Sequence, residues 1–130
     1  MSNDSNIDRL LTDWPYDPDS VSVRLVKGDD GREVIQMRLD MGVLQLETIG
    51  RPDGARPHGN ETFFDYLLAE SIAGGAEFEF TEEQCGEADR EFVQFYHRRV
   101  CWIALREYKK AVDDADHTLA FMDLCKAHSP

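Results

Sequence analysis

Apolar and polar residues alternate with a period of two over three short stretches in the first half of the chain. The stretches are residues 21–26, 33–40 and 43–49. The apolar positions within them are Val21, Val23, Leu25, Ile35, Met37, Leu39, Leu44 and Leu46. This period is typical of strands with one buried face. Because the connections are short, we predict a three-stranded antiparallel meander whose polar face meets water and whose apolar face needs a cover.

Two short segments on either side of the meander have helical periodicity instead. The first has apolar residues at Ile7, Leu10, Leu11 and Trp14. We expect Asp4 or Ser5 to cap this helix and Pro15 to end it. Its apolar face would pack on the body of the protein, or alternatively bind a partner. The second helix is expected from about Thr62 to Ile72, because Gly74 and Gly75, which follow shortly after, should end it.

The last third of the chain reads as helical. Thr81 and Gln84 fit a capping box at its start. One apolar run then follows at Ala88, Phe92, Phe95, Tyr96, Trp102 and Ile103, and a second at Tyr108, Ala111, Ala115, Thr118, Leu119 and Met122. The break between the runs, near Arg106 and Glu107, has neither Gly nor Pro. Periodicity therefore fits a helical hairpin or one continuous helix.

Residues 92–125 resemble a single tetratricopeptide repeat, a helix–turn–helix unit of about 34 residues. Phe95 and Trp102 match its two aromatic positions, and Ala111 matches the small residue at the helix crossing. Leu105 closes the first helix and Tyr108 opens the second. The resemblance implies an antiparallel hairpin. Since a lone repeat cannot bury its own faces, we expect this hairpin to cover the apolar face of the sheet.

A second resemblance covers residues 35–59, IQMRLDMGVLQLETIGRPDGARPHG. This segment is similar to the opening of a family of uncharacterised bacterial proteins, best represented in planctomycetes, many of which are described as UvrB/UvrC-motif proteins. That motif is a helical hairpin used for protein–protein contact. The segment EYKKAVDDAD, residues 107–116, is similar to it, although Ala115 stands where the motif has Arg. The family implies no established activity.

Taken together, the patterns predict one α+β domain over residues 1–130. Residues 1–80 would hold the N-terminal helix, the β-meander and the short helix, and residues 81–130 the tetratricopeptide-like hairpin. A chain of 130 residues is long enough to bury a core without disulfides or metal.

The composition narrows the choice of cellular setting and partner. The net charge of −12 disfavours nucleic acid and anionic membranes on average. Three cysteines without a disulfide spacing indicate a reducing compartment. The N-terminus lacks the basic and apolar regions of a signal peptide, and no segment reaches the ~20 apolar residues needed to span a bilayer. We therefore expect a cytoplasmic protein with no membrane contact.

The loop GRPDGARPHG, residues 50–59, contains the pattern Arg-Pro-x-Gly twice. Its spacing fits neither a Walker loop nor a dinucleotide fingerprint. It does fit two successive turns, with Pro at the first central position and Gly at the close. Arg51, Arg56 and His58 are nevertheless candidate ligands for a carboxylate or phosphate, if their side chains converge.

Other constellations point only weakly to chemistry. His97 and Cys101, and Asp113 and His117, have i, i+4 spacing, but no zinc motif is present. No nucleophile motif and no paired carboxylates of a dry cleft are visible. We therefore predict no catalytic residue, no metal site and no cofactor.

One basic patch stands out from the acidic chain, in the segment HRRVCWIALREYKK. Its cations are Arg98, Arg99, Arg106, Lys109 and Lys110. They are candidates for contact with an acidic partner or a nucleic-acid backbone. The alternative is that they offset nearby carboxylates through i, i+4 and inter-helix pairs.

The sequence thus favours a non-enzymatic protein–protein interaction or adaptor domain whose partner is a protein. The first alternative is a nucleic-acid-associated accessory factor that uses the basic patch. The second is an enzyme or binder of a small anion at Arg51 and Arg56.

Overall fold

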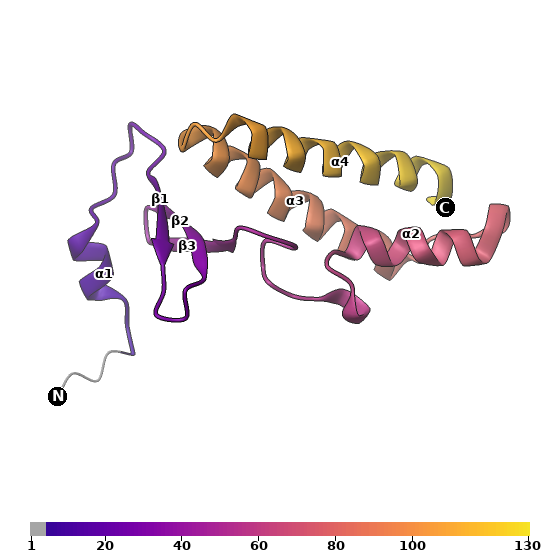
Figure 1. The fold of residues 1–130 in the computed structure, drawn as a ribbon, viewed down its shortest axis with the longest axis horizontal. Coiled ribbons are helices and arrows are strands. Elements are labelled where there is room, and N and C mark those ends of the chain that lie inside the picture. Colours follow the sequence, from indigo (N-terminus) through magenta and orange to yellow (C-terminus); the bar gives the residue numbers. More distant parts are fainter. Residues whose placement is uncertain (1–4) are drawn as a thin grey trace.

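The computed structural model describes residues 5–130 and has an α+β fold (Figure 1). A short helix precedes a three-stranded sheet, and longer helices follow it. The elements are α1 (Asp8–Asp13), β1 (Val23–Lys27), β2 (Glu33–Leu39), β3 (Gly42–Glu47), α2 (Phe63–Gly74), α3 (Glu82–Ala104) and α4 (Tyr108–His128). The predicted fold class is confirmed, because the sheet is antiparallel and α3 and α4 pack together.

The sheet is the predicted meander, with strand order β1-β2-β3. Its register places Ile35 between Leu25 and Leu46, so the apolar alternation of all three strands falls on one face. Ile35, Met37 and Leu46 on that face are buried. Val21, Leu25 and Leu39 were predicted with them, but they are 56%, 37% and 43% exposed. Val21 lies before β1, Leu25 lies on an edge strand, and Leu39 lies at the end of β2, next to the turn.

The other face of the sheet carries a ladder of polar side chains. Arg24 Nε donates to Gln36 Oε1 at 2.9 Å, and Gln36 Nε2 donates to Gln45 Oε1 at 3.0 Å. Trp14, just after α1, lies against the Arg24 guanidinium at 4.1 Å from the ring centroid. Arg38 is buried and donates to the Trp14 carbonyl, so this face does not meet water everywhere as predicted.

Helix α1 forms as predicted but packs loosely. None of its residues is buried, and Ile7, which precedes it, is about half exposed. Neither predicted cap is established: the Asn6 side chain accepts the N–H of Asp8, and Asp4 lies outside the described residues.

Helices α3 and α4 form a hairpin rather than one continuous helix. The predicted capping box is present at the start of α3, with Thr81 and Gln84 bonded reciprocally at 2.9 and 3.1 Å. Between the helices, Arg106 adopts a φ of 62°, a left-handed conformation that usually requires glycine. The N–H of Glu107 reaches back to the Trp102 carbonyl at 2.8 Å and closes the turn.

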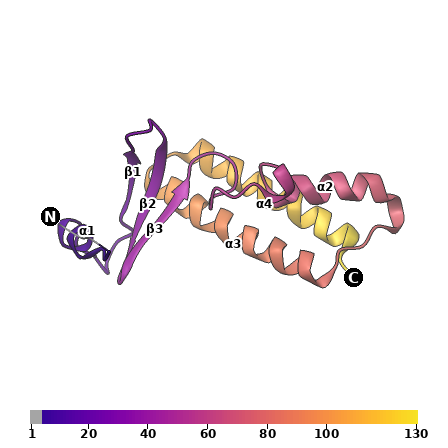
Figure 2. The same ribbon diagram turned by 90° about the horizontal axis from the view of Figure 1, so that it is seen from below.

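The sheet covers only part of the hairpin. We call the turn around residues 105–107 the closed end, and the opposite end, at Glu82 and His128, the open end. Figures 1 and 2 show the sheet beside the closed end and α2 beside the open end. The prediction that the hairpin covers the sheet therefore holds for the closed end only, because α3 begins well before the repeat-like unit and extends beyond the sheet.

Two separate apolar clusters reflect this division. At the closed end, Trp102 and Ala111 of the hairpin belong to one buried cluster with residues of the sheet. The full cluster comprises Ile35, Met37, Leu46, Cys101, Trp102 and Ala111. At the open end, α2 contributes Phe63 and Leu67, and the rest of the cluster is Phe80, Ala88, Phe121 and Leu124.

Candidate functional site

The loop over residues 50–59 consists of two successive turns, as the repeated Arg-Pro-x-Gly pattern predicts. The Gly54 N–H donates to the Arg51 carbonyl at 2.8 Å, and the Gly59 N–H donates to the Arg56 carbonyl at 3.0 Å. Both glycines have a φ near +80°, which favours glycine over any other residue. The prolines and glycines of this loop are therefore explained by backbone geometry.

The three candidate anion ligands of this loop contact different groups. Arg51 is buried, and its guanidinium lies 2.6 Å from Glu87 Oε2 and 3.3 Å from Glu91 Oε1. Arg56 is exposed and donates to the Gly59 carbonyl at 3.2 Å. His58 is exposed and stacks on a tyrosine ring of α2. A free anion at Arg51 would have to compete with carboxylates already in place.

The carboxylate of Glu91 is the most buried charged group that we find in residues 5–130. It accepts the N–H groups of Phe63 and Phe64 at 2.8 and 3.0 Å. These N–H groups lie in the first turn of α2, where no intrahelical partner exists. Its Oε2 also lies 3.2 Å from Nε2 of His117, whose ring stacks on Phe95 at 3.9 Å. Glu91 therefore links α2, α3 and α4, and its contact with Arg51 links the loop over residues 50–59 to them.

A second buried ion pair, between Arg98 and Asp114, lies nearer to the closed end than Glu91 does. Nε and Nη2 of Arg98 each donate to Asp114 at 2.9 Å, across the two helices of the hairpin. Nη1 of Arg98 donates to the carbonyls of Glu47 and Gly50 at 3.1 and 2.9 Å. Arg98, a candidate for partner contact, thus directs its guanidinium inward and fastens the end of β3 to the hairpin.

The other four cations of the basic patch lie at the surface near the closed end. Arg99 lies over the Tyr96 ring at 5.4 Å, and Lys110 lies over the Trp102 ring at 4.8 Å. Arg106 and Lys109 are exposed. These four side chains remain accessible to a partner.

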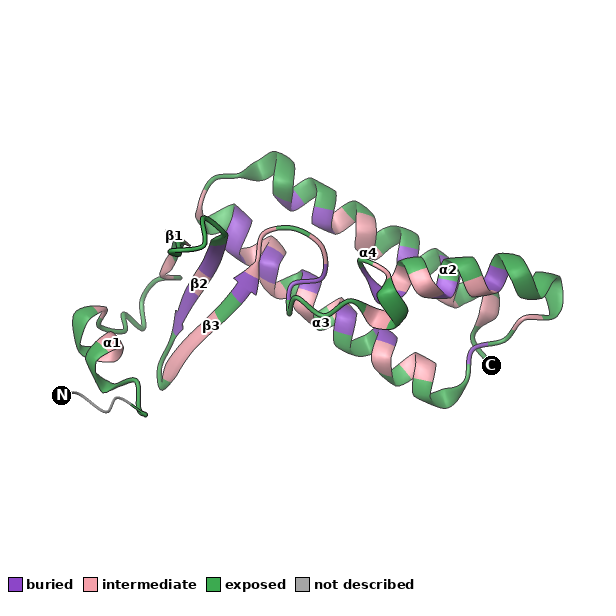
Figure 3. Ribbon diagram, turned by 60° about the horizontal axis from the view of Figure 1, so that its bottom comes forward, coloured by how far each residue is buried: buried purple, intermediate pink, exposed green. Residues whose placement is uncertain are grey.

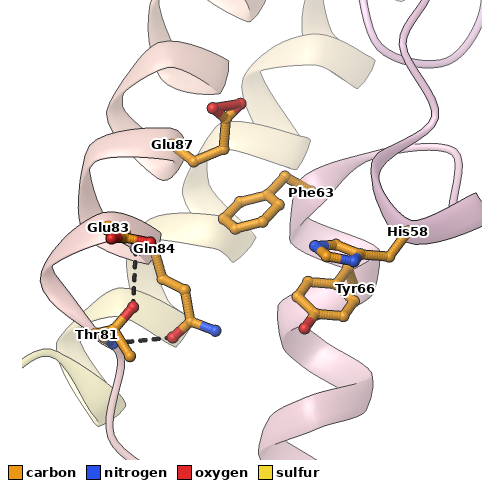
Figure 4. A pocket seen from close by; sticks show the side chains of 7 residues that line it. All are labelled: His58, Phe63, Tyr66, Thr81, Glu83, Gln84 and Glu87. Atoms are coloured by element: carbon orange, nitrogen blue, oxygen red, sulfur yellow. Dashed lines mark hydrogen bonds between the residues drawn. The ribbon is translucent and has the colours of Figure 1, made fainter.

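A cleft of about 410 Å³ separates α2 from the first turns of α3 (Figure 4). One wall is aromatic, and there His58 stacks on Tyr66 at 3.9 Å. The other wall is polar and consists of Thr81, Glu83, Gln84 and Glu87. Thr81 and Gln84 bind each other in the capping box, and Glu87 pairs with Arg51, so most of these polar groups are already satisfied.

Within this cleft, the hydroxyl of Tyr66 donates to Glu70 at 3.0 Å, and this bond raises the pKa of Tyr66. The cleft thus combines aromatic rings with polar side chains, most of which already pair with one another or with Arg51.

The hairpin has apolar residues on a second, uncovered face. On α3 they recur with spacings of three and four residues, and so do those on α4. We define the outer face by Val93, Tyr96, Val100, Ile103, Tyr108, Val112, Ala115, Leu119 and Met122. The larger of these side chains, apart from the half-buried Val100, are between 44% and 60% exposed. Figure 3 shows the exposed turns along one side of α4 and the buried turns on the side toward α3.

Both rows of the outer face lie on the same side of the hairpin. Successive residues of an α-helix are turned by about 100° about the helix axis. Counted in this way, the exposed row of each helix lies roughly 130° around the axis from its buried row, in the same sense on both helices. In two antiparallel helices that face each other, equal rotations in one sense bring both rows to the same side. A groove of about 340 Å³ between the helices, lined by Phe92, Met122 and Cys125, agrees with this geometry.

The sequence patterns did not separate this outer face from the core. Tyr96, Ile103, Leu119 and Met122 were grouped with buried residues because helical spacing alone does not tell which side of a helix is covered. The spacing of three and four residues from Val93 to Ile103 was the available signal. Glu91 and Asp114 had no such signal, because their burial depends on distant segments.

Comparison of the chain with models of known protein families, with curated protein sequences and with solved structures finds no match. The resemblances to the tetratricopeptide repeat and to the UvrB/UvrC-motif family therefore stay predictions. Across residues 5–130, we find no cluster of three or more His, Cys, Asp or Glu side chains suited to a metal ion. No helix in the same range is long and apolar enough to cross a membrane.

Proposed function

We propose that this chain is an intracellular, non-enzymatic protein–protein interaction or adaptor domain that contacts its partner through the outer face of the hairpin. The observation that carries the proposal is the set of seven large apolar side chains, each about half exposed, along two neighbouring helices. From these exposed fractions, the seven residues leave roughly 700 Å² accessible, which is on the scale of the apolar patches of a few hundred Å² that often mark interaction sites.

The shape of the outer face supports a helical partner. Two parallel rows of apolar side chains with a groove between them match the way in which an amphipathic helix lies on a receptor. The groove at the open end, between Phe92 and Met122, would accept an apolar side chain of such a helix. The Arg98–Asp114 ion pair and the contact of Glu91 with His117 both join α3 to α4, which supports a groove whose shape is set before binding.

Photo-crosslinking in the native cell tests this proposal. A benzophenone amino acid replaces Leu119, a residue of the outer face that is 59% exposed, and adducts are identified by mass. The matched control carries the same amino acid at Ile49, which is 79% exposed but lies far from the outer face in sequence and outside the hairpin. We expect a protein adduct from position 119 only. Equal adducts from both positions, or none from position 119, would refute the proposal.

A nucleic-acid-associated role is the second candidate. The observation that favours it is the surface position of Arg99, Arg106, Lys109 and Lys110 near the closed end. Binding through these cations would be electrostatic and would weaken with rising salt. Retention on DNA or RNA in low salt, lost on Arg106→Glu/Lys109→Glu, would support this role. Absence of retention in low salt would end it.

A further inference from the structure

The geometry of the outer face points to one particular occupant. We propose that it binds a second copy of this chain, turned by a two-fold axis so that the closed end of one hairpin lies against the open end of the other. The product is an antiparallel four-helix bundle made of two hairpins. This inference rests on the proposed function, because it names the partner of the same surface.

The exposed apolar area agrees with a dimer interface. About 700 Å² from each copy gives roughly 1,400 Å² in total, which falls within the 1,200–2,000 Å² of a standard stable interface. The rows span from Val93 to Ile103 on α3 and from Tyr108 to Met122 on α4, so the area extends over both helices. Packing of apolar rows from facing helix pairs is the usual way in which four-helix bundles form a core.

The distribution of charge favours the antiparallel orientation. At the closed end, the exposed cations Arg106 and Lys109 flank the outer face. At the open end, Asp89 continues the α3 row four residues before Val93, and Asp123 borders Met122. A two-fold axis through the centre of the outer face brings the cations of one copy toward the acids of the other, at both ends of the dimer.

Charges of the opposite kind also lie near each end. Glu107 accompanies the cations of the closed end. At the open end, Arg90 accompanies the acids, and Lys126 continues the α4 row four residues after Met122 and lines the groove. Arg90 lies 3.8 Å from Glu87, within its own copy. A parallel dimer would set Arg106 and Lys109 against the same residues of the second copy, so the antiparallel arrangement has the smaller electrostatic cost.

Sedimentation equilibrium of the full chain, from low micromolar to millimolar concentration, tests the dimer. We expect a monomer–dimer equilibrium whose Kd rises at least about tenfold for Leu119→Asp, because a charge would enter the apolar interface. Ile49→Asp is the matched control and should leave the Kd unchanged. Circular dichroism of each variant checks the fold, which these exposed positions should not disturb.

A charge-reversal pair tests the orientation. Arg106→Glu/Lys109→Glu places acids where the closed end had cations, and Asp89→Lys/Asp123→Lys places cations where the open end had acids. In the antiparallel dimer each variant should self-associate more weakly than the wild type, whereas an equimolar mixture should recover the wild-type affinity. Weakening without recovery, or no weakening, would overturn the antiparallel orientation.

The outcomes separate this inference from the proposed function. A chain that stays monomeric at every concentration, or a dimer insensitive to Leu119→Asp, overturns the self-association. If position 119 then still crosslinks to a different protein in the cell, the interaction function stands with another partner. If position 119 gives no adduct of either kind, both proposals fail.

Discussion

Replacement of Arg98 by methionine should destabilise the protein strongly, although the sequence places this residue in a basic surface patch. Its guanidinium makes two hydrogen bonds to Asp114 and two to backbone carbonyls, and both side chains are buried. Methionine fills much of the space but donates no hydrogen bond. Arg98→Met therefore leaves the Asp114 carboxylate without its counter-charge inside the protein.

The size of the effect follows from this burial. Removing one partner of a buried ion pair typically costs about 3–5 kcal/mol, and we expect about 4 kcal/mol here. That is a large share of the ~5–15 kcal/mol by which a domain is usually stable. The double variant Arg98→Met/Asp114→Leu removes both charges and should recover at least about 2 kcal/mol of the loss.

Urea unfolding followed by circular dichroism measures the free energy of unfolding. With an m-value of about 2 kcal/mol/M, the midpoint of Arg98→Met should fall by about 2 M at unchanged m. Arg99→Met is the matched control from the same patch. It removes only a contact with the Tyr96 ring and should cost about 1 kcal/mol or less. Equal small losses for Arg98→Met and Arg99→Met would refute the buried role of Arg98.

Three further predictions concern other parts of the fold. Glu91→Gln removes the charge that faces Arg51 and weakens the bonds to the first turn of α2, so urea unfolding should show a loss of about 2–3 kcal/mol; a loss below about 0.5 kcal/mol would contradict the network. Thr81→Ala removes the N-cap of α3 and should cost about 1 kcal/mol in the same assay; an unchanged midpoint would mean that the cap contributes nothing. Burial raises the pKa of the Cys101 thiol to about 11, so iodoacetamide should modify it only after unfolding. This pKa is higher in the folded state than the ordinary value of 9.0. The contribution of the protonated thiol to stability is therefore complete below pH 9 and is lost between pH 9 and 11. The Cys101→Ala variant is the control, and a wild-type stability that falls no more steeply than that of the variant over this range would contradict the prediction.

Much of the architecture was predictable because its signals are local in sequence. Alternation over three short stretches is sufficient for the sheet, since neighbouring strands are joined by tight turns. Trp102 and Ala111, the large and the small residue of the repeat-like pattern, both lie in the buried cluster at the sheet. The turn itself was harder to predict. Arg106 adopts a left-handed φ that is usual only for glycine, so periodicity alone did not distinguish a hairpin from a continuous helix. Only the resemblance to a tetratricopeptide repeat favoured the hairpin.

The site-level features depend on contacts between distant segments. Glu91 and Arg98 look like ordinary surface charges within an acidic and a basic run. Each is buried because a partner arrives from elsewhere: the first turn of α2 for Glu91, and Asp114 with the end of β3 for Arg98. Similarly, periodicity identified apolar residues on α3 and α4, but the position of α2 and the sheet decides which of them are covered.

The separation of the two apolar clusters along the hairpin has a consequence for the local opening reactions of the native protein. The ion pairs of Glu91 and Arg98 lie between the cluster at the sheet and the cluster at α2, and no residue belongs to both clusters. We therefore expect the strands to detach transiently while α2 and the open end of the hairpin stay folded. We also expect α2 to detach while the sheet and the closed end stay folded. Amide hydrogen exchange under native conditions would register these as two distinct opening reactions, each below the cost of global unfolding.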